Sequence, residues 1–274
     1  MKPILKWAGG KSWAVEYLNK FIPEFDRYVE PFVGGGAFFF ALNAKQAVIN
    51  DLNKDLICTY EMLRDKCGVV IAYLKKFQEM QDSLGLEKFY YEARKIFNSI
   101  EQSNAKKAAL FIYLNSKCHC GLTRYNKSGG FNVPLHACGP EKRKIPSDKR
   151  LMLVSAALAN TEIHRQDFYE IIENCHRGDF ILADPPYDPI TTTANFTAYT
   201  KDGFAWEDQV RLRLALQVAD EKGAKWFCFN NDTERIRELY KDYPEPYVLP
   251  VKRRICAREK TKATELNELC FKNF

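Results

Sequence analysis

The sequence predicts an α/β protein whose sheet is interrupted by a helical insertion. Near the N-terminus, apolar runs at 27–33 and 47–53 flank a glycine turn and a short apolar helix, which is the rhythm of a βαβ unit in a parallel sheet. Residues 56–115 then carry apolar side chains at intervals of three and four, the spacing of helices. Strand-like runs return only from residue 161 onward. We therefore expect one sheet built from both ends of the chain around an insertion near residues 56–146.

The individual elements follow from periodicity and from the residues that end each run. Short apolar runs that stop at proline, glycine or an acid are expected to be strands, and longer amphipathic runs are expected to be helices. The expected strands are 27–33, 47–53, 161–165, 179–183, 225–232, 247–255 and 265–274. Besides the short helix after the glycine turn, the expected helices are 56–65, 69–80, 87–100, 105–115, 148–160 and 204–223.

Composition limits the class of protein. The 274 residues carry a net charge of +6, and basic residues cluster at 139–150 and 251–262, which suits a polyanionic partner or a solvated surface. No run reaches the ~18–20 apolar residues of a membrane span, and the N-terminus lacks the apolar core of a signal peptide. We expect a soluble, cytoplasmic protein that does not bind a membrane.

The nine cysteines are expected to be reduced thiols, because no export signal accompanies them. Cys118, Cys120, His136 and Cys138 together offer four zinc ligands, but a one-residue gap within each pair departs from the usual spacing of two to four. Cysteine is also a common buried apolar residue. We therefore expect no bound metal ion.

In the decapeptide "ILADPPYDPI" (181–190), an apolar run is followed directly by an aspartate, two prolines and a tyrosine. A proline cannot donate to a sheet ladder, so the strand ends there and Asp184 stands at its carboxyl end. Each proline holds the residue before it in extended geometry. Asp184, Pro185, Pro186 and Tyr187 thus form a stiff tetrapeptide with two oxygen acceptors and a ring, suited to hold a small planar group.

Two glycine-rich stretches are candidates for ligand binding. In "EPFVGGGAF", glycines at the carboxyl end of a parallel strand let the backbone approach a ligand, and Asp51 ends the next strand, where it could accept hydrogen bonds from a ribose diol. Phe39 stands where the dinucleotide fingerprint needs its third glycine. "KWAGGKS" is not a P-loop, because its opening glycine is replaced by Leu5.

The ordered set "LKWAGGK", "VEPFVGGGAF" and "DPPY", with the insertion between the last two, resembles the Dam-type DNA adenine-N6 methyltransferases. The likeness extends through "GLTRYNKSGGFNVP" and "TTTANFTAY" to the "VKRR…ELNELCF" tail and so covers nearly the whole chain. It implies a Rossmann-like methyltransferase sheet formed by 1–55 and 147–274, with 56–146 as the target-recognition domain. It also implies S-adenosylmethionine as cofactor and double-stranded DNA as substrate, in a monomer of prokaryotic or phage origin.

The resemblance also assigns roles to particular residues. Asp184 and the Pro185 carbonyl would hold the adenine amine, with Pro186 fixing the geometry and Tyr187 stacking on the base. The cofactor-binding residues would be Trp7, Lys11, Glu30, Phe32, Gly34, Gly36, Asp51, Asp167, Phe168 and Asp184. The DNA-binding residues would be His119, Leu122, Arg124, Asn126, Asn132, Pro134, Lys252, Arg253 and Arg254.

Arg124 is the expected base-reading residue, because its fork matches guanine O6 and N7; a phosphate contact or a surface salt bridge is the alternative. One departure concerns the target sequence. Members that methylate GATC often carry an aromatic–asparagine pair before "GL", whereas His119 and Cys120 stand here. Because Arg124 and its neighbours persist, GATC remains the expected site.

Other functions with similar motifs stay open at this point. Glutamine-N5 and cytosine-N4 methyltransferases also present a planar amine to such a tetrapeptide, but protein-glutamine enzymes usually begin it with asparagine. A catalytically inactive DNA-binding homologue is the alternative from another functional class. A further alternative is the same chemistry at a different recognition sequence. The sequence leaves open whether the enzyme belongs to a restriction–modification system.

Overall fold

The structure is a computed structural model that describes residues 1–136, 144–189, 203–252 and 265–274. It divides into two compact units. The helical unit comprises Met1–Val15, Gly34–Asn43 and Asn53–Ile163, and the sheet unit comprises Glu16–Val33, Ala44–Leu52 and His164–Phe274. The helical unit therefore includes two N-terminal segments and residues 147–163 besides the insertion. The division into a catalytic domain of 1–55 and 147–274 and a target-recognition domain of 56–146 stays a functional prediction.

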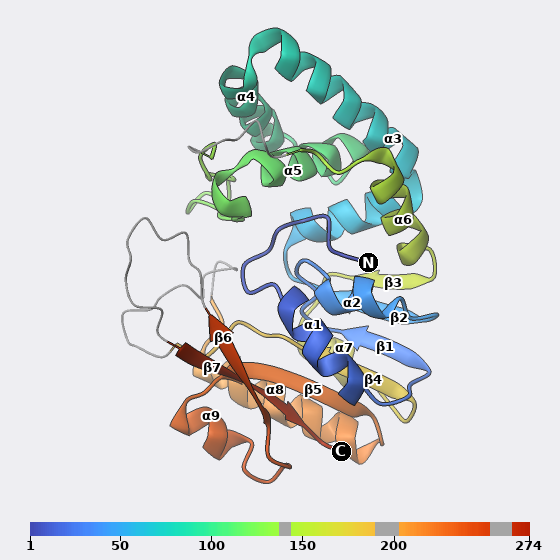
Figure 1. Ribbon diagram of the computed structural model, residues 1–274, viewed down its shortest axis with the longest axis vertical. Coiled ribbons are helices and arrows are strands. Elements are labelled where there is room, and N and C mark those ends of the chain that lie inside the picture. Colours follow the sequence, from blue (N-terminus) through green and yellow to red (C-terminus); the bar gives the residue numbers. More distant parts are fainter. Residues whose placement is uncertain (137–143, 190–202, 253–264) are drawn as a thin grey trace. The chain divides into compact units, whose positions relative to one another are not determined.

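One sheet of seven strands has the order β3-β2-β1-β4-β5-β7-β6 (Figure 1). Its strands are β1 (Arg27–Glu30), β2 (Ala47–Asn50), β3 (Thr161–His164), β4 (Asp179–Ala183), β5 (Lys225–Asn231), β6 (Tyr247–Lys252) and β7 (Glu265–Lys272). Strands β2, β1, β4 and β5 pair in parallel, and β7 lies antiparallel to both β5 and β6. The strand order reverses between β1 and β4, and at such a point parallel sheets bind ligands at their carboxyl ends.

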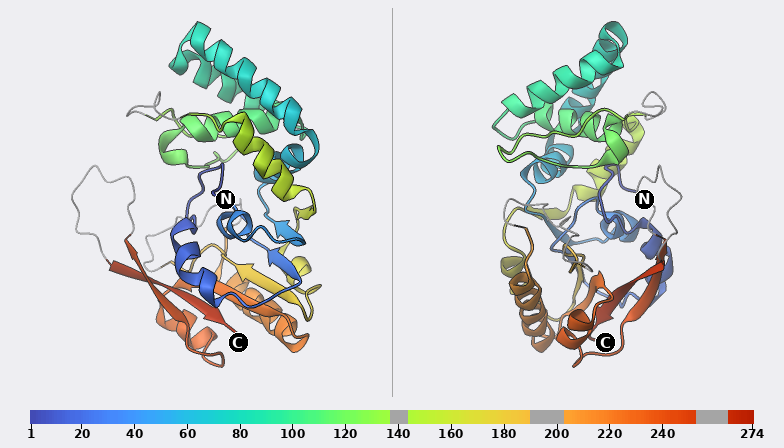
Figure 2. Two further views of the ribbon diagram at one scale, coloured as in Figure 1. Left: turned by 45° about the vertical axis from the view of Figure 1, so that its right-hand side comes forward. Right: turned by 90° about the vertical axis from the view of Figure 1, so that its left-hand side faces the viewer.

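Apolar side chains on both faces explain why β4 is a continuous apolar run. Its five residues are all buried. Ile181 and Ala183 join a core with α7 (Phe168–Ile172), α8 (Trp206–Glu221) and α9 (Glu234–Leu239), which cover one face of the sheet (Figure 2). Phe180, on the opposite face, packs its ring against Phe227 at 5.2 Å. A strand buried on both faces cannot alternate with polar residues, so residues 180–183 are all apolar, and the buried Asp179 before them pairs with Arg27.

The helical unit contains five further helices of the described chain, labelled in Figure 1: α2 (Ala37–Leu42), α3 (Lys54–Leu84), α4 (Leu86–Ser99), α5 (Ala105–Lys117) and α6 (Asp148–Leu158). Asn53 caps α3 by accepting from two backbone N–H groups, and Asn104 caps α5 from one. Aromatic rings of α3, α4 and α5 pack together, with the centroids of Phe89 and Tyr113 5.2 Å apart.

The predicted α/β class is confirmed, and most predicted elements lie within a few residues of their expected bounds. The two helices expected at 56–65 and 69–80 form one helix, α3, with a break in helical geometry at Lys66. Three short helices were not predicted: α1 (Ser12–Leu18), α7 and α9. Among the described residues, no helix is long and apolar enough to cross a bilayer.

Candidate active site

The tetrapeptide begins directly after β4, at the carboxyl edge of the parallel strands. Pro185 is buried, while Asp184 and Tyr187 are half-buried. The Tyr187 hydroxyl donates to Oε2 of Glu268 on β7 at 3.0 Å. Burial raises the pKa of Tyr187 well above its usual 10.0, and the charges of Asp184 and Glu268 add to this effect. The hydroxyl therefore keeps its proton at neutral pH and acts as a donor.

A buried amide network supports the two prolines from behind. Gln209 on α8 is 1% exposed and donates from Nε2 to the Pro186 carbonyl at 2.9 Å. Its own Oε1 accepts from Asn230 on β5 at 2.9 Å. Asn230 in turn accepts from the backbone N–H of Asp188 at 3.0 Å. This chain of bonds fixes the segment after Tyr187 to one helix and one strand.

Asp188 anchors the end of the same segment. Its carboxylate is buried and pairs with the guanidinium of Arg235, and it also accepts from the Thr233 hydroxyl at 3.1 Å. Arg235 lies over the ring of Trp206, 4.5 Å from its centroid. A buried carboxylate requires partners of this kind. The tetrapeptide is thus held at both ends, by β4 and by Asp188.

Asn50, the last residue of β2, ties three connections together at this edge. Its Nδ2 donates to the carbonyls of Pro31 and Gln166, each at 3.0 Å, and its Oδ1 accepts from the Gln166 N–H at 2.9 Å. The next residue is Asp51, which is half-buried. Because Asn50 fixes the turn, Asp51 stands on a rigid connection rather than on a free loop.

Three phenylalanines gather beside these connections. The ring centroid of Phe32 lies 5.3 Å from Phe168 and 5.9 Å from Phe204, and Phe168 and Phe204 are 5.8 Å apart. Arg211 stacks over Phe168 at 5.0 Å and donates to Oδ1 of Asp167 at 3.0 Å. The same Asp167 oxygen accepts from the Tyr169 N–H, so Asp167 is also the N-cap of α7. An apolar ring cluster beside a carboxylate suits a heteroaromatic ligand.

Glu30 ends β1 in a buried position, at 3% exposure. It accepts from the hydroxyl of Tyr28 at 2.8 Å. Burial and then the charge of Glu30 raise the pKa of Tyr28 well above its usual 10.0, with a smaller contribution from Asp184. Tyr28 therefore remains a donor that satisfies one oxygen of the Glu30 carboxylate.

The glycine turn packs against Trp7 in the helical unit. Gly34 has a φ of +45°, and a Cβ there would lie 2.7 Å from Cδ1 of Trp7. The Gly34 carbonyl accepts from the hydroxyl of Tyr60 at 2.7 Å. Gly36 has a φ of +71° at the start of α2. Lys11 is buried, and its Nζ donates to the Gly9 carbonyl at 2.7 Å.

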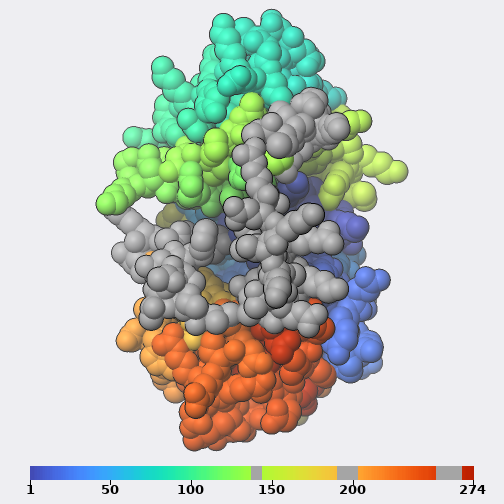
Figure 3. Space-filling view, turned by 60° about the vertical axis from the view of Figure 1, so that its left-hand side comes forward, coloured from blue at the N-terminus to red at the C-terminus, as the bar shows by residue number. Residues whose placement is uncertain are grey.

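Residues 122–134 form a hairpin-like loop at the surface of the helical unit, in green in Figure 3. Tyr125 and Phe131 pair across it as an antiparallel bridge. Oδ1 of Asn126 accepts from the backbone N–H groups of Ser128 and Gly130, which shapes the tip. The exposed Arg124 donates from Nε to Oδ1 of Asn132 at 2.8 Å. That bond orients the guanidinium.

The loop is anchored to two helices of the helical unit, α3 and α4. The Tyr125 hydroxyl donates to Oδ2 of the buried Asp55 at 2.8 Å. Asn98 on α4 exchanges hydrogen bonds with the backbone N–H and carbonyl of Phe131. The hydroxyl of Tyr90 donates to the Val133 carbonyl at 2.8 Å. The exposed tip is therefore carried on a fixed base.

The structure distributes the predicted site residues between the two units. The sheet unit brings together, at the carboxyl ends of its strands, Glu30, Phe32, Asp51, Asp167, Phe168 and Asp184 to Tyr187. The helical unit holds Trp7, Lys11, Gly34, Gly36, His119, Leu122, Arg124, Asn126, Asn132 and Pro134. Lys252 ends β6, while Arg253, Arg254 and the "TTTANFTAY" segment lie outside the described residues.

Several residues that support the site were not predicted: Gln209, Asn230, Glu268, Phe204 and Asp188. Each is distant in sequence from the residue it contacts, as with the 81 positions between Tyr187 and Glu268. A polar residue within an expected helix or strand was the only available signal. Gln209 and Asn230 carry that signal, because Gln209 shares the buried face of α8 with Leu212 and Asn230 follows the apolar run of β5.

The chain is similar in sequence to several known proteins. The type II methyltransferase M.MjaIII of Methanocaldococcus jannaschii is 35% identical over 96% of each chain. The DNA adenine methylase of Escherichia coli K12 is 30% identical over 95% of this chain and 91% of its own. The DNA N-6-adenine-methyltransferase of Escherichia phage P1 is 37% identical over 88% of this chain, which spans only 31% of that longer protein.

A family match covers most of the molecule, from residue 7 to residue 255, and so includes the glycine turn, the hairpin-like loop and the tetrapeptide. These features follow one another in the same order as the motifs that gave the resemblance to Dam-type methyltransferases. A methyltransferase of this family acts on adenine in DNA and requires a methyl donor. The chain belongs to the D12 class of N6 adenine-specific DNA methyltransferases.

Proposed function

We propose that the protein transfers a methyl group from S-adenosylmethionine to N6 of an adenine flipped out of duplex DNA, within GATC. The observation that carries this proposal is the support of the tetrapeptide. Tyr187 is bonded to Glu268, Pro186 to Gln209 and Asp188 to Arg235. Acceptors on such a support need little reorganisation when the reaction occurs.

The residues at the strand ends fit the cofactor. Asp51 offers a carboxylate for two ribose hydroxyls, and the ring cluster of Phe32, Phe168 and Phe204 offers a flat apolar surface for an adenine. Asp167 lies beside that cluster, where it can accept from an exocyclic amine. When bound, S-adenosylmethionine supplies an electrophilic methyl group on a sulfonium. Glu30, Trp7, Lys11, Gly34 and Gly36 are assigned to the same ligand by resemblance.

The chemical task is to free the lone pair of N6, which in adenine is delocalised into the ring. The Asp184 carboxylate and the Pro185 carbonyl accept the two N6 hydrogens and turn the lone pair toward the methyl group. The Tyr187 ring stacks on the base, and its bond to Glu268 fixes the hydroxyl end and thus the direction of the side chain. Asp184 then accepts the proton that N6 loses. The transfer is thus accelerated by positioning and by fixed acceptors.

Flipping an adenine out of a duplex costs a few kcal/mol of unstacking and unpairing. We assign the compensating contacts to the loop 122–134. Arg124 reads guanine, because Asn132 accepts from its Nε and, at 3.5 Å, from Nη2, while the side chain stays exposed. Leu122, Asn126, Pro134 and His119 shape the same surface. Lys252, Arg253 and Arg254 are assigned to the DNA backbone by resemblance alone.

The decisive experiment incubates the purified protein and S-adenosylmethionine with unmethylated genomic DNA and maps modified bases by single-molecule sequencing. N6-methyladenine confined to GATC is the expected result. Asp184→Ala is the matched control, which should leave the DNA unmodified. Methyladenine in another motif would retain the chemistry and refute GATC, and His119 and Cys120 would then be the first residues to vary.

The alternative of an inactive DNA-binding homologue makes a different prediction. Such a protein would bind duplex DNA but release no heat with S-adenosylmethionine. If cofactor binds and no DNA base is methylated, the DNA substrate is wrong and RNA or protein becomes the next substrate to test.

A further inference from the structure

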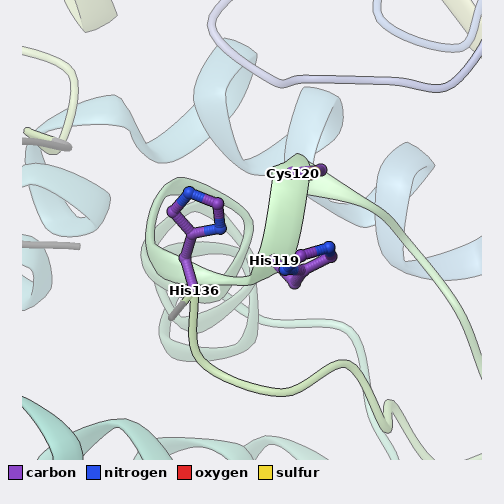
Figure 4. Close-up of side chains that lie close together, drawn as sticks. All are labelled: His119, Cys120 and His136. Carbon is purple, nitrogen blue, oxygen red and sulfur yellow. The ribbon is translucent and has the colours of Figure 1, made fainter. Parts of the chain in front are cut away.

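Two histidines and a cysteine meet where the loop 122–134 joins the body of the helical unit. His119 and Cys120 lie in the short helical turn η2 (His119–Gly121), and His136 follows the loop (Figure 4). Their ligand atoms all lie within 4.8 Å of one another, and each residue is partly exposed. The ring centroids of the two histidines are 5.3 Å apart. None of the hydrogen bonds that we assign to methyl transfer involves these three residues.

The backbone brings the three side chains together. Cys118 and Leu135 form an antiparallel bridge. The His119 N–H donates to the Pro134 carbonyl at 2.9 Å, and the His136 N–H donates to the Lys117 carbonyl at 3.1 Å. The segments before and after the loop are thus paired. Side chains from positions 119, 120 and 136 are set close together by this pairing rather than by chance rotamers.

Cys120 adopts a left-handed backbone conformation, with a φ of +54° and a ψ of +10°. This conformation is unfavourable for a residue with a Cβ, so the surrounding structure must hold it there. Cys118, two residues earlier, is fully buried, and its Sγ contacts the carbonyls of Asn115 and Leu122. The ligand set considered from the sequence, with Cys118 as a member, is therefore replaced by one with His119.

We propose that His119, Cys120 and His136 bind a zinc ion. One thiolate and two imidazoles are ligands that Zn²⁺ prefers. With Zn–S of about 2.3 Å and Zn–N of about 2.0–2.1 Å, tetrahedral ligand atoms lie roughly 3.3–3.6 Å apart. The 4.8 Å limit of the cluster is wider by little more than 1 Å, a distance that side-chain rotation covers. Among the described residues no fourth ligand joins the group, and Cys138 lies outside them.

The redox state of Cys120 decides whether the site can form. Cys120 is disulfide-bonded in the structure, whereas the other described cysteines are free thiols. Zinc requires the thiolate. A thiol or phosphine reductant must first supply two electrons and two protons to convert the disulfide into two thiols. Zinc binding then displaces the proton of the Cys120 thiol.

The site would connect the two ends of the loop that carries Arg124. A metal bonded to residues 119, 120 and 136 closes that loop at its base, in addition to the hydrogen bonds of the backbone. Zinc binding itself does not depend on the proposed function; only its consequence for DNA recognition does. The metal serves to fix the loop and takes no part in methyl transfer.

The test measures zinc by mass spectrometry in the full chain, purified with a phosphine reductant and without chelator. About one zinc per chain is expected, because structural sites of this kind bind tightly. Cys120→Ser, His119→Ala and His136→Ala should each weaken zinc binding by at least roughly 100-fold, since even loss of an outer partner costs about 10–100-fold. Cys67→Ser and His176→Gln, which remove the same residue types elsewhere, should retain the metal.

Cobalt substitution supplies a second readout that does not depend on activity. Co²⁺ in the reduced protein should show a thiolate charge-transfer band and the intense visible bands of tetrahedral coordination, and both should vanish in Cys120→Ser. Zinc bound equally by Cys120→Ser would overturn the ligand set. A folded, reduced protein without zinc, or a Cys120 that stays oxidised in the reductant, would overturn the site. Methylation mapping of the same variants reports separately on the proposed function.

Discussion

The hydroxyl of Tyr187 donates to Glu268, so the tetrapeptide after β4 is joined to a strand 81 residues further along the chain. This bond fixes the hydroxyl end, and so the direction, of the ring that we assign to base stacking. A tyrosine without a fixed hydroxyl partner would rotate about its side-chain bonds and would hold a flipped base in several orientations. The pair therefore belongs to the positioning of the substrate as well as to the sheet.

Tyr187→Phe should lower the single-turnover rate of methyl transfer about tenfold, which corresponds to one neutral or charge-assisted hydrogen bond of about 1.5 kcal/mol. Tyr187→Ala removes the ring as well and should cost more. Glu268→Gln should behave nearly as wild type, because the amide oxygen still accepts. Tyr17→Phe, at an exposed ring, is the control. Equal rates for Tyr187→Phe and wild type would show that the bond does not orient the ring.

The glycine turn offers a test of local packing. Gly34→Ala places a Cβ 2.7 Å from the Trp7 ring at a φ of +45°, whereas Gly129→Ala meets nothing within 4 Å at a φ of +80°. Both carry the cost of a left-handed residue, about 1 kcal/mol, but only Gly34→Ala adds overpacking of about 1–3 kcal/mol. Urea unfolding should therefore rank Gly34→Ala as the less stable variant. The reverse order would show that Trp7 moves away without cost.

Arg124 should determine discrimination at guanine. Arg124→Ala is expected to reduce the preference for the intact site over a guanine-substituted duplex by about 1–3 kcal/mol, measured as a ratio of kcat/KM values. Asn132→Ala, which removes the partner of Nε, should lose part of the same preference. Lys127→Ala, at the exposed tip, should instead weaken binding to all sequences and reduce the salt dependence. Unchanged discrimination in Arg124→Ala would refute the assignment.

Alkaline pH should destabilise the sheet unit through Cys228. Burial raises the pKa of its thiol from 9.0 to about 12; the hydrogen bond with Tyr240 opposes this rise, and the charge of Asp184 adds to it. Because the folded pKa lies above the unfolded one, the stabilisation is complete below pH 9. It falls by about 1.4 kcal/mol per pH unit as the pH rises toward 12.

Cys228→Ser tests this dependence, because serine does not titrate and can still bond to Tyr240. The difference in free energy of unfolding between wild type and Cys228→Ser should be constant from pH 7 to 8.5 and shrink between pH 9.5 and 11. Urea titrations at each pH measure it. Burial, the largest cause of the raised pKa of Tyr240, acts in both proteins, whereas Cys228 raises that pKa further only in the wild type. Repeating the comparison in a Tyr240→Phe background removes this coupling. Parallel curves over the whole range would contradict the shifted pKa of Cys228.

The sequence predicted the strands well because most are buried apolar runs with clear ends, such as β4 before Pro185. It missed α1, α7 and α9, which have seven, five and six residues, because too few turns are present for a helical period to emerge. It also divided α3 near Gly68. Packing of both halves of α3 within the helical unit keeps the helix continuous there despite the break at Lys66.

The candidate site was predictable only in part. Asp184 and Asp51 could be placed at strand ends, since the carboxyl ends of parallel strands share an edge. The contacts of Gln209 with Pro186 and of Asn230 with Asp188 depend on which helix and strand lie behind the tetrapeptide. No spacing rule contains that information, because it arises from the tertiary arrangement of the sheet unit.

Strand β7 has a consequence for the order in which the protein can mature. It is the last strand along the chain, yet it lies between β5 and β6 in the sheet. During synthesis β5 and β6 therefore emerge before the strand that separates them, and Tyr187 emerges long before Glu268. The ribosome must release residues 265–272 before the sheet can close, so Tyr187 gains its partner Glu268 only after β7 has been synthesised.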